Sequence, residues 1–200
     1  MAILRIILEG DRRLRQKATR IRMVDPSLRR LAADLHETML DAPGIGLAAP
    51  QVGVLRRLVV VSVPENYGGD GEPSTVLSLV NPEIVKSQGR LFAGEGCLSI
   101  PGWVGEVPRA ETITVKAIDL HNKPLRLKLR GFPARVIQHE IDHLDGILFI
   151  DRVEDRDTLV HVPEDDDPDL ESRERMPVGA GHIALTDRGD EDAVGPETAR

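Results

Sequence analysis

Cysteine and aromatic residues are both scarce in this chain of 200 residues. The single cysteine excludes a disulfide within the chain and is typical of a protein from a reducing compartment. Aromatic residues make up only 2% of the sequence and apolar residues 40%, so leucine, valine and isoleucine must build the core. No run approaches the roughly 18 apolar residues of a membrane span, and the apolar start is interrupted by Arg5 and lacks the pattern of a secretory signal. We therefore predict a cytoplasmic protein that does not insert into a membrane.

The net charge of −7 is concentrated at the C-terminal end. Residues 161–200 contain twelve acidic residues and four arginines, which leaves 22 basic and 21 acidic residues in the first 160. Because no basic stripe with interleaved aromatic residues is present, we do not predict direct nucleic-acid binding. The acidic segment cannot bury enough apolar surface to offset its ordering entropy. We predict a folded domain over residues 1–157, with order fading after Asp151, and a disordered, solubilising tail over residues 158–200.

The apolar pattern predicts an α+β fold with largely antiparallel strands and two helices. The first helix is capped by Asp25 and ends before Pro43. The second helix follows Gly131 and stops at Gly146, and each helix has a proline in its first turn. Residues 3–8 form either a short strand or an apolar arm packed on the core. β-Branched content and alternation predict strands at residues 58–63, 76–80, 84–86, 112–118 and 125–130.

The predicted second helix contains the sequence QHEIDHLDG at residues 138–146. A spacing of four places the imidazoles of His139 and His143 on one face, one turn apart, where both can bind one metal ion. Glu140 lies about 100° further round the axis, so it reaches a water on the metal more easily than the metal itself. This HExxH pattern supplies two ligands and a general base. The alternative is an ordinary helix with two hydrogen-bonded histidines and a surface glutamate.

A catalytic metal site needs a third protein ligand and one open position. The candidates are Cys97, another histidine or a carboxylate. A lone cysteine is usually a small buried apolar residue, but Gly96 beside it lets backbone approach, and the missing ligand favours Cys97. A ligating imidazole usually donates its other N–H to an acceptor. Glu95 and Asp142 lie close in sequence to the candidate ligands and are possible acceptors. Arg109 is able to balance a buried carboxylate. We interpret all three residues as structural.

Three motifs together resemble the signature motifs of the peptide deformylases, in sequence, order and spacing. They are GIGLAAPQ at 44–51, which we expect to be a loop, EGCLS at 95–99 and QHEIDHLDG at 138–146. The similarity covers about residues 1–155 and includes LRQKA at 14–18 and VNPEI at 80–84. The resemblance implies a bacterial-type enzyme that removes the N-formyl group from the N-terminal methionine of newly made polypeptides and releases formate.

The resemblance also implies the roles of the site residues. The thiolate and the two imidazoles would hold a metal ion that lowers the pKa of a bound water towards neutrality, and Glu140 would pass its proton to the leaving amine. The metal, the side-chain amide of Gln51 and the backbone N–H of Leu98 would stabilise the negative oxygen. Ligand chemistry alone favours zinc, whereas the family implies ferrous iron. We predict Fe²⁺, with Zn²⁺ or Ni²⁺ as substitutes.

Substrate is predicted to bind as an added strand, because backbone contacts suit an enzyme that accepts many sequences. Glycines that would leave room for a peptide are Gly44, Gly46 and Gly96. A pocket for the methionine side chain needs apolar walls, and the candidates are Ile45, Phe132 and Val136. The alternative is that these three residues pack in the core. Trp103 either borders the entry for the substrate or packs against neighbouring residues of the protein. The expected partners are N-formylmethionyl nascent peptides and, transiently, the ribosome, although the acidic tail argues against the docking helix proposed for some family members.

Two other functions share part of this pattern. A zincin-type metallopeptidase needs a third histidine or glutamate ligand beyond the HExxH helix, and the Cys97 motif argues against it. An inactive binding protein would hold a structural metal with four protein ligands or would lack the base. Because Glu140 and Gln51 are both present, the sequence favours an enzyme.

Overall fold

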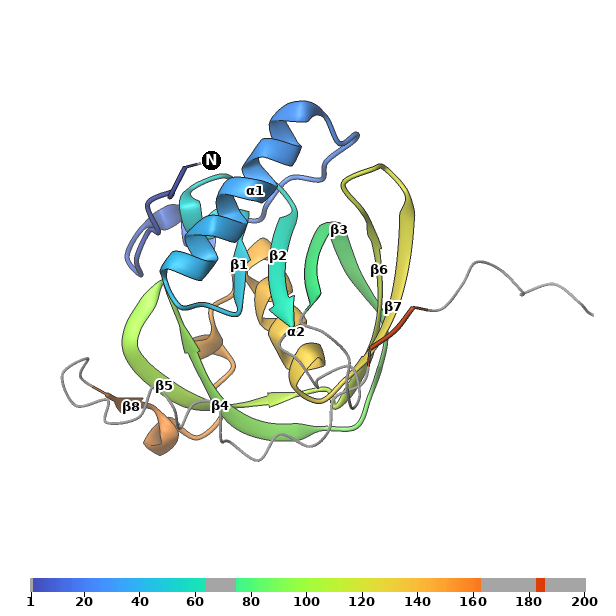
Figure 1. The fold of residues 1–200 in the computed structure, drawn as a ribbon. Helices are drawn as coiled ribbons and strands as arrows, with labels where there is room; N and C mark the ends of the chain where they lie inside the picture. Colours follow the sequence, from blue (N-terminus) through green and yellow to red (C-terminus); the bar gives the residue numbers. More distant parts are fainter. Residues whose placement is uncertain (1, 64–74, 163–182, 186–200) are drawn as a thin grey trace, which may run out of the picture.

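The computed structural model describes residues 2–63, 75–162 and 183–185, so the disorder predicted for most of the tail lies outside the described residues. The fold is α+β with antiparallel strands, as predicted, and two α-helices among the described residues, α1 (Pro26–Asp41) and α2 (Phe132–Leu144). One sheet has the order β1-β2-β3-β6-β7-β9 and the other β4-β5-β8 (Figure 1). The strands are β1 (Gly46–Ala48), β2 (Leu58–Val63), β3 (Thr75–Gln88), β4 (Leu91–Cys97), β5 (Ile100–Arg109), β6 (Thr112–Ile118), β7 (Pro124–Arg130), β8 (Val160–His161) and β9 (Ile183–Leu185).

Strand β2 lies between the two helices, which explains why its sequence LVVVSV is apolar almost throughout (Figure 1). Val59 and Val61 pack in the core cluster that includes α2. Leu58 and Val60 point the other way, into the cluster built on the apolar stripe of α1. A strand covered on both faces needs apolar residues at every position rather than at alternate ones. The helix α2 is therefore held inside the fold against the rigid centre of the sheet.

Strand β3 is continuous across Asn81-Pro82, where the sequence predicts two separate strands. Asn81 adopts a left-handed conformation with φ 52°, which asparagine tolerates better than most residues. Its side chain accepts a hydrogen bond from the backbone N–H of Ile21 at 2.8 Å and donates one to the Ile21 carbonyl at 2.7 Å. The register against β6 shifts at this point, so the strand bends without ending.

The described residues continue past Asp151 to residue 162. Two short 3₁₀ helices, η3 (Phe149–Asp151) and η4 (Arg156–Thr158), lead into β8, which pairs with β5. Phe149 and Val153 are buried in a third core cluster with Val107 of β5. This segment therefore packs on the second sheet, and it also contacts α2 through Phe149 on His139 and Arg152 on Asp142.

The N-terminal residues form an arm rather than a strand. The N–H of Ile7 donates to the carbonyl of Gln51 and the N–H of Glu9 to the carbonyl of Ser99, each at 2.8 Å. The predicted loop at 44–51 is also more regular than expected, because it contains β1 and the 3₁₀ helix η2 (Ala49–Val52). The arm therefore joins two of the three motifs.

No helix in the described part of the chain is both long enough and apolar enough to cross a membrane.

Candidate metal centre

Helix α2 carries an unusual number of buried polar side chains. Gly131 precedes it at φ 67°, and Gly146 ends it at φ 75°. A Cβ on Gly146 would lie 2.7 Å from the backbone of Arg15, so both the backbone angle and the available space require glycine there. The buried polar residues of the helix are Gln138, His139, Glu140, Asp142 and His143. Buried polar groups need partners, and these partners define the site.

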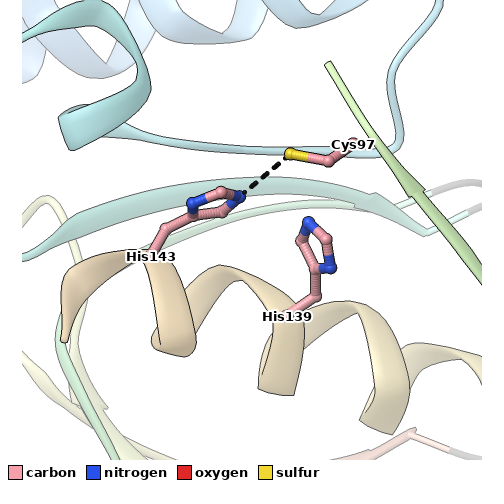
Figure 2. Close-up of side chains that lie close together, drawn as sticks. All are labelled: Cys97, His139 and His143. Atoms are coloured by element: carbon pink, nitrogen blue, oxygen red, sulfur yellow. Dashed lines mark hydrogen bonds between the residues drawn. The ribbon is translucent and has the colours of Figure 1, made fainter. Parts of the chain in front are cut away.

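The thiol of Cys97 and the two imidazoles converge on one point (Figure 2). One ligand atom from each of Cys97, His139 and His143 lies within 4.8 Å of the others, and the Cys97 sulfur is 3.3 Å from Nε2 of His143. Sulfur and nitrogen ligands on one tetrahedral ion lie about 3.5 Å apart, as the usual bond lengths dictate. The three side chains therefore fit a divalent metal ion without rearrangement of the backbone.

The second ring nitrogen of His139 is fixed by a carboxylate. Nδ1 of His139 lies 3.0 Å from Oε2 of Glu95, and the ring stacks on Phe149 with the centroids 6.3 Å apart. Burial opposes charge on His139, but the negative groups of Cys97 and Glu95 outweigh burial and hold the pKa of His139 well above its usual range. A metal binds the neutral imidazole; with Nδ1–H donated to Glu95, Nε2 is the atom left to bind it, in the arrangement typical of metal-ligating histidines.

Glu140 and His143 each keep one buried side-chain atom without a hydrogen-bond partner among the described residues, Oε2 and Nδ1 respectively. Burial raises the pKa of Glu140 to about 7 and lowers the pKa of His143 well below its usual range. The carboxylate of Glu140 lies against β1, where a Cβ on Gly46 would be 2.3 Å from its Oε1. A buried carboxylate with a free oxygen and a pKa near neutrality is suited to accept and return a proton.

Gln51 is buried beside the thiol. Its Oε1 accepts a hydrogen bond from the N–H of Ala48 at 2.8 Å, which orients Nε2 towards the Cys97 sulfur at 3.6 Å and the Ser99 hydroxyl at 3.3 Å. The backbone N–H of Ser99 also donates to that sulfur at 3.4 Å. Ser99 is fully buried, and sequence reasoning missed its role although it lies within the EGCLS motif. Leu98, in the turn between Cys97 and β5, is half-buried against the α1 cluster.

The three residues interpreted as structural form one ion-pair network behind the ligands. The guanidinium of Arg109 donates to both oxygens of Glu95, each at 2.9 Å, and to Asp142 at 2.5 Å. Burial raises a carboxyl pKa, yet the hydrogen bonds from His139 and Arg109 outweigh it and lower the pKa of Glu95 to about 2. Arg152, which the sequence analysis did not identify, pairs with the other side of Asp142 at 2.7 Å.

The residues predicted to contact the substrate differ in how closely other atoms surround them and in how exposed they are. A Cβ on Gly44 would lie 2.8 Å from the Leu98 side chain, so Gly44, like Gly46, leaves room for the chain's own side chains. A Cβ on Gly96 would make only ordinary contacts, the nearest at 3.5 Å, so space around it does not require glycine. Ile45 and Trp103 are exposed. Phe132 and Val136 are half-buried in the first turns of α2, and Val136 packs against the core.

Comparisons with known proteins identify the family of this chain. The family profile described as polypeptide deformylase matches residues 3–158. A peptide deformylase of Thermomicrobium roseum is 57% identical over 172 residues, which cover 86% of this chain and 98% of that protein. A crystal structure of a peptide deformylase from Legionella pneumophila matches with a TM-score of 0.69 at 46% identity, covering 76% of this chain and 87% of that one.

A class I type b peptide deformylase from Acinetobacter baumannii, solved with Met-Ala-Ser bound, matches with a TM-score of 0.70 at 37% identity. That match covers 76% of this chain and 99% of the A. baumannii chain. The profile spans the segments that supply Gln51, Cys97 and His139, and the T. roseum relative covers most of the sequence. The chain belongs to the polypeptide deformylase family, the hydrolases that remove the N-formyl group from newly made polypeptides.

Proposed function

We propose that this chain hydrolyses the formyl amide of N-formylmethionyl peptides at a metal ion held by Cys97, His139 and His143. The observation that carries the proposal is the convergence of these three ligand atoms within 4.8 Å, with the carboxylate of Glu140 buried one residue after the first histidine. Three ligands leave a fourth tetrahedral position open, as a catalytic site requires and a structural site does not.

The bound ion would act as a Lewis acid that makes water nucleophilic near neutral pH. The other steps belong to side chains of the chain. Glu140 accepts the proton of the attacking water on its carboxylate and delivers it to the amine nitrogen as the C–N bond breaks, so formate and a free amino terminus leave. The free Oε2 of Glu140 and its pKa of about 7 support this shuttle, because an efficient base has a pKa near the working pH.

Negative charge on the formyl oxygen needs hydrogen-bond donors that are already in place. We assign these to the amide Nε2 of Gln51 and the backbone N–H of Leu98. The hydrogen bond from Ala48 to Oε1 of Gln51 supports this role, since it fixes which end of the amide faces the thiol. Ser99 accepts from the same amide and limits its rotation.

The substrate is proposed to be a peptide with N-formylmethionine at its start, bound as an extended strand. The A. baumannii structure contains Met-Ala-Ser, a peptide with an unformylated N-terminal methionine, which has the chemistry of the product. β1 and β4 are edge strands of the two sheets among the described residues, and their backbone groups would pair with such a strand. Ile45, Phe132 and Val136 are the proposed apolar walls for the methionine side chain, with Gly44, Gly46 and Gly96 along the peptide.

The metal is proposed to be Fe²⁺, with Zn²⁺ or Ni²⁺ as substitutes. A thiolate next to a redox-active ion predicts that activity is lost in air. Removing the metal with a chelator should abolish formate release, and anaerobic Fe²⁺ should restore it. If protein that contains only zinc has the full activity of the anaerobic iron protein, the assignment of iron is wrong.

We also propose that residues 1–157 are the catalytic domain and that residues 158–200 are an appended acidic tail. The family profile, which ends at residue 158, supports this boundary. The single cysteine and a substrate made during translation support action in the cytoplasm. Contact with the ribosome would be transient, and the nearly neutral first 160 residues support the absence of direct nucleic-acid binding.

The test compares formate release from a formyl-Met peptide by wild type, Glu140→Ala and the control Glu154→Ala, which removes an exposed carboxylate. Loss of the general base should lower kcat by about 10²–10⁴-fold while metal content stays at one ion per chain. The control should match wild type. Equal formate release by wild type and Glu140→Ala would contradict the proposal, and cleavage of internal peptide bonds would favour a zincin-type peptidase.

A further inference from the structure

We propose that Arg152 is a positioning residue for the metal site, acting through Asp142, Arg109 and Glu95 on the ligand His139. The inference rests on the metal site proposed above and extends it to a side chain of the segment that follows α2. Arg152 immediately follows η3, so the network joins the C-terminal segment to the helix that carries both histidines.

A continuous series of hydrogen bonds runs from Arg152 to the ligand. Nε and Nη2 of Arg152 donate to the two oxygens of Asp142 at 3.1 and 2.7 Å. Asp142 accepts a third hydrogen bond from Arg109, whose other two nitrogens bind both oxygens of Glu95. Glu95 then meets Nδ1 of His139 at 3.0 Å. The Arg152–Asp142 and Arg109–Glu95 contacts are each two-pronged bonds between charged groups, which makes them stronger and more directional than neutral ones.

The charge balance of the network explains why a second arginine is needed. The carboxylates of Glu95 and Asp142 are 5% and 10% exposed, and Arg109 is 6% exposed. With His139 neutral, as a metal ligand must be, the single buried guanidinium of Arg109 does not neutralise two buried carboxylates, and an uncompensated buried charge is costly. With Arg152 on Asp142, Arg109 keeps its two-pronged contact with Glu95. Without Arg152, Arg109 would be drawn towards Asp142, and the carboxylate that orients His139 would lose its anchor.

The surroundings of Arg152 indicate that its removal leaves the fold intact. Its side chain is 44% exposed, and a cavity next to α2 is lined by Arg109, Asp142 and Arg152 among other residues. Water can therefore reach Asp142 when the guanidinium is removed. The expected defect lies in the orientation of the ligand rather than in folding, and metal binding itself reports it.

The experiment loads metal-free protein with Co²⁺ and measures its dissociation constant, its release rate and the visible absorption of the bound ion. Removal of a residue that orients a metal ligand lowers affinity by about tenfold or more, so we expect about this loss in Arg152→Ala, with faster release and an altered spectrum. Arg152→Lys should recover part of the loss, since lysine keeps the charge but not the fork. Arg90→Ala is the matched control, because Arg90 pairs with Glu154 of the same C-terminal segment in an exposed ion pair.

Thermal unfolding of the metal-free proteins separates folding from metal binding. A folded Arg152→Ala protein with wild-type Co²⁺ affinity and spectrum would overturn the inference, and so would equal losses in Arg152→Ala and Arg90→Ala. In an Asp142→Asn background, Arg152→Ala should add little further loss, since its partner is already neutral. An additive loss of Co²⁺ affinity in the double variant would also overturn the proposed series of hydrogen bonds from Arg152 to His139. Wild-type protein without the absorption band of a cobalt–thiolate bond would instead overturn the proposed metal site itself.

Discussion

Replacing Gly46 with alanine would place a methyl group against the carboxylate of Glu140. A Cβ built on Gly46 lies 2.3 Å from Oε1, 2.8 Å from Cδ and 3.0 Å from Cγ of Glu140. Gly46 is not among the residues with a positive φ, so the backbone accepts a side chain without strain. The clash is with the end of a side chain, and the carboxylate has to move to relieve it.

The size of this movement sets the expected effect. Carbon and oxygen atoms in ordinary contact are about 3.4 Å apart or more, so the carboxylate must withdraw by about 1 Å. A displacement of about 1 Å in a catalytic group costs about 10²-fold in rate, which corresponds to about 3 kcal/mol of activation free energy. Because the ligands belong to other side chains, we expect the variant to bind one metal ion per chain. Overpacking should cost about 1–3 kcal/mol of stability.

The assay is kcat for formate release from a formyl-Met peptide by metal-loaded Gly46→Ala, with metal content measured on the same sample. Gly94→Ala is the control, because a Cβ there meets only Val104, at an ordinary 3.5 Å. Wild-type kcat in a fully loaded Gly46→Ala protein would refute the reasoning. Activity lost only in proportion to metal would show that the ligands, rather than Glu140, had moved.

Two further predictions concern Gln51 and the cap of α1. Gln51→Ala should lower kcat by about 10²–10³-fold, the usual effect of removing one oxyanion donor, with the far-ultraviolet circular dichroism spectrum unchanged, and an unchanged kcat would contradict its role. Asp25 accepts a hydrogen bond from the N–H of Leu28 at 2.8 Å, so Asp25→Ala should lower the free energy of unfolding in urea by about 1 kcal/mol. Its kcat should not change, and a loss of activity would mean that α1 has a role beyond packing.

The helices and strands whose ends are set by residues close in sequence were predictable from the sequence. The cap at Asp25, the glycines at 131 and 146 and the apolar run of β2 act over a few residues, and the structure confirms each. The supposed break at Asn81 was wrong for the opposite reason. The partner that allows the strand to continue is Ile21, 60 residues away, and no local pattern reveals it.

The residues of the candidate site also fall into two groups, those that a local sequence pattern predicts and those that it does not. The two histidines one turn apart follow from helix periodicity, and their ring centroids lie 4.9 Å apart. Cys97 was inferred from a missing ligand and from a family resemblance, because its distance in sequence from α2 carries no geometric information. Arg152 gave no signal at all, since an arginine after a helix is usually a surface residue. Its partner Asp142 becomes informative only when the carboxylate is seen to be buried.

The segment from Ile7 to Ala18, which includes the arm and the residues that follow it, contacts all three motifs although none of its residues belongs to them. Three backbone hydrogen bonds, each 2.8 Å long, join it to one residue in each motif. They run from Ile7 to Gln51, from Glu9 to Ser99 and from Ala18 to Leu144. Because backbone atoms make these contacts, the hydrogen bonds themselves do not specify side chains, and Ile7 and Ala18 are constrained instead by packing against the core. The geometry of the site thus depends partly on residues whose sequence carries no record of that role.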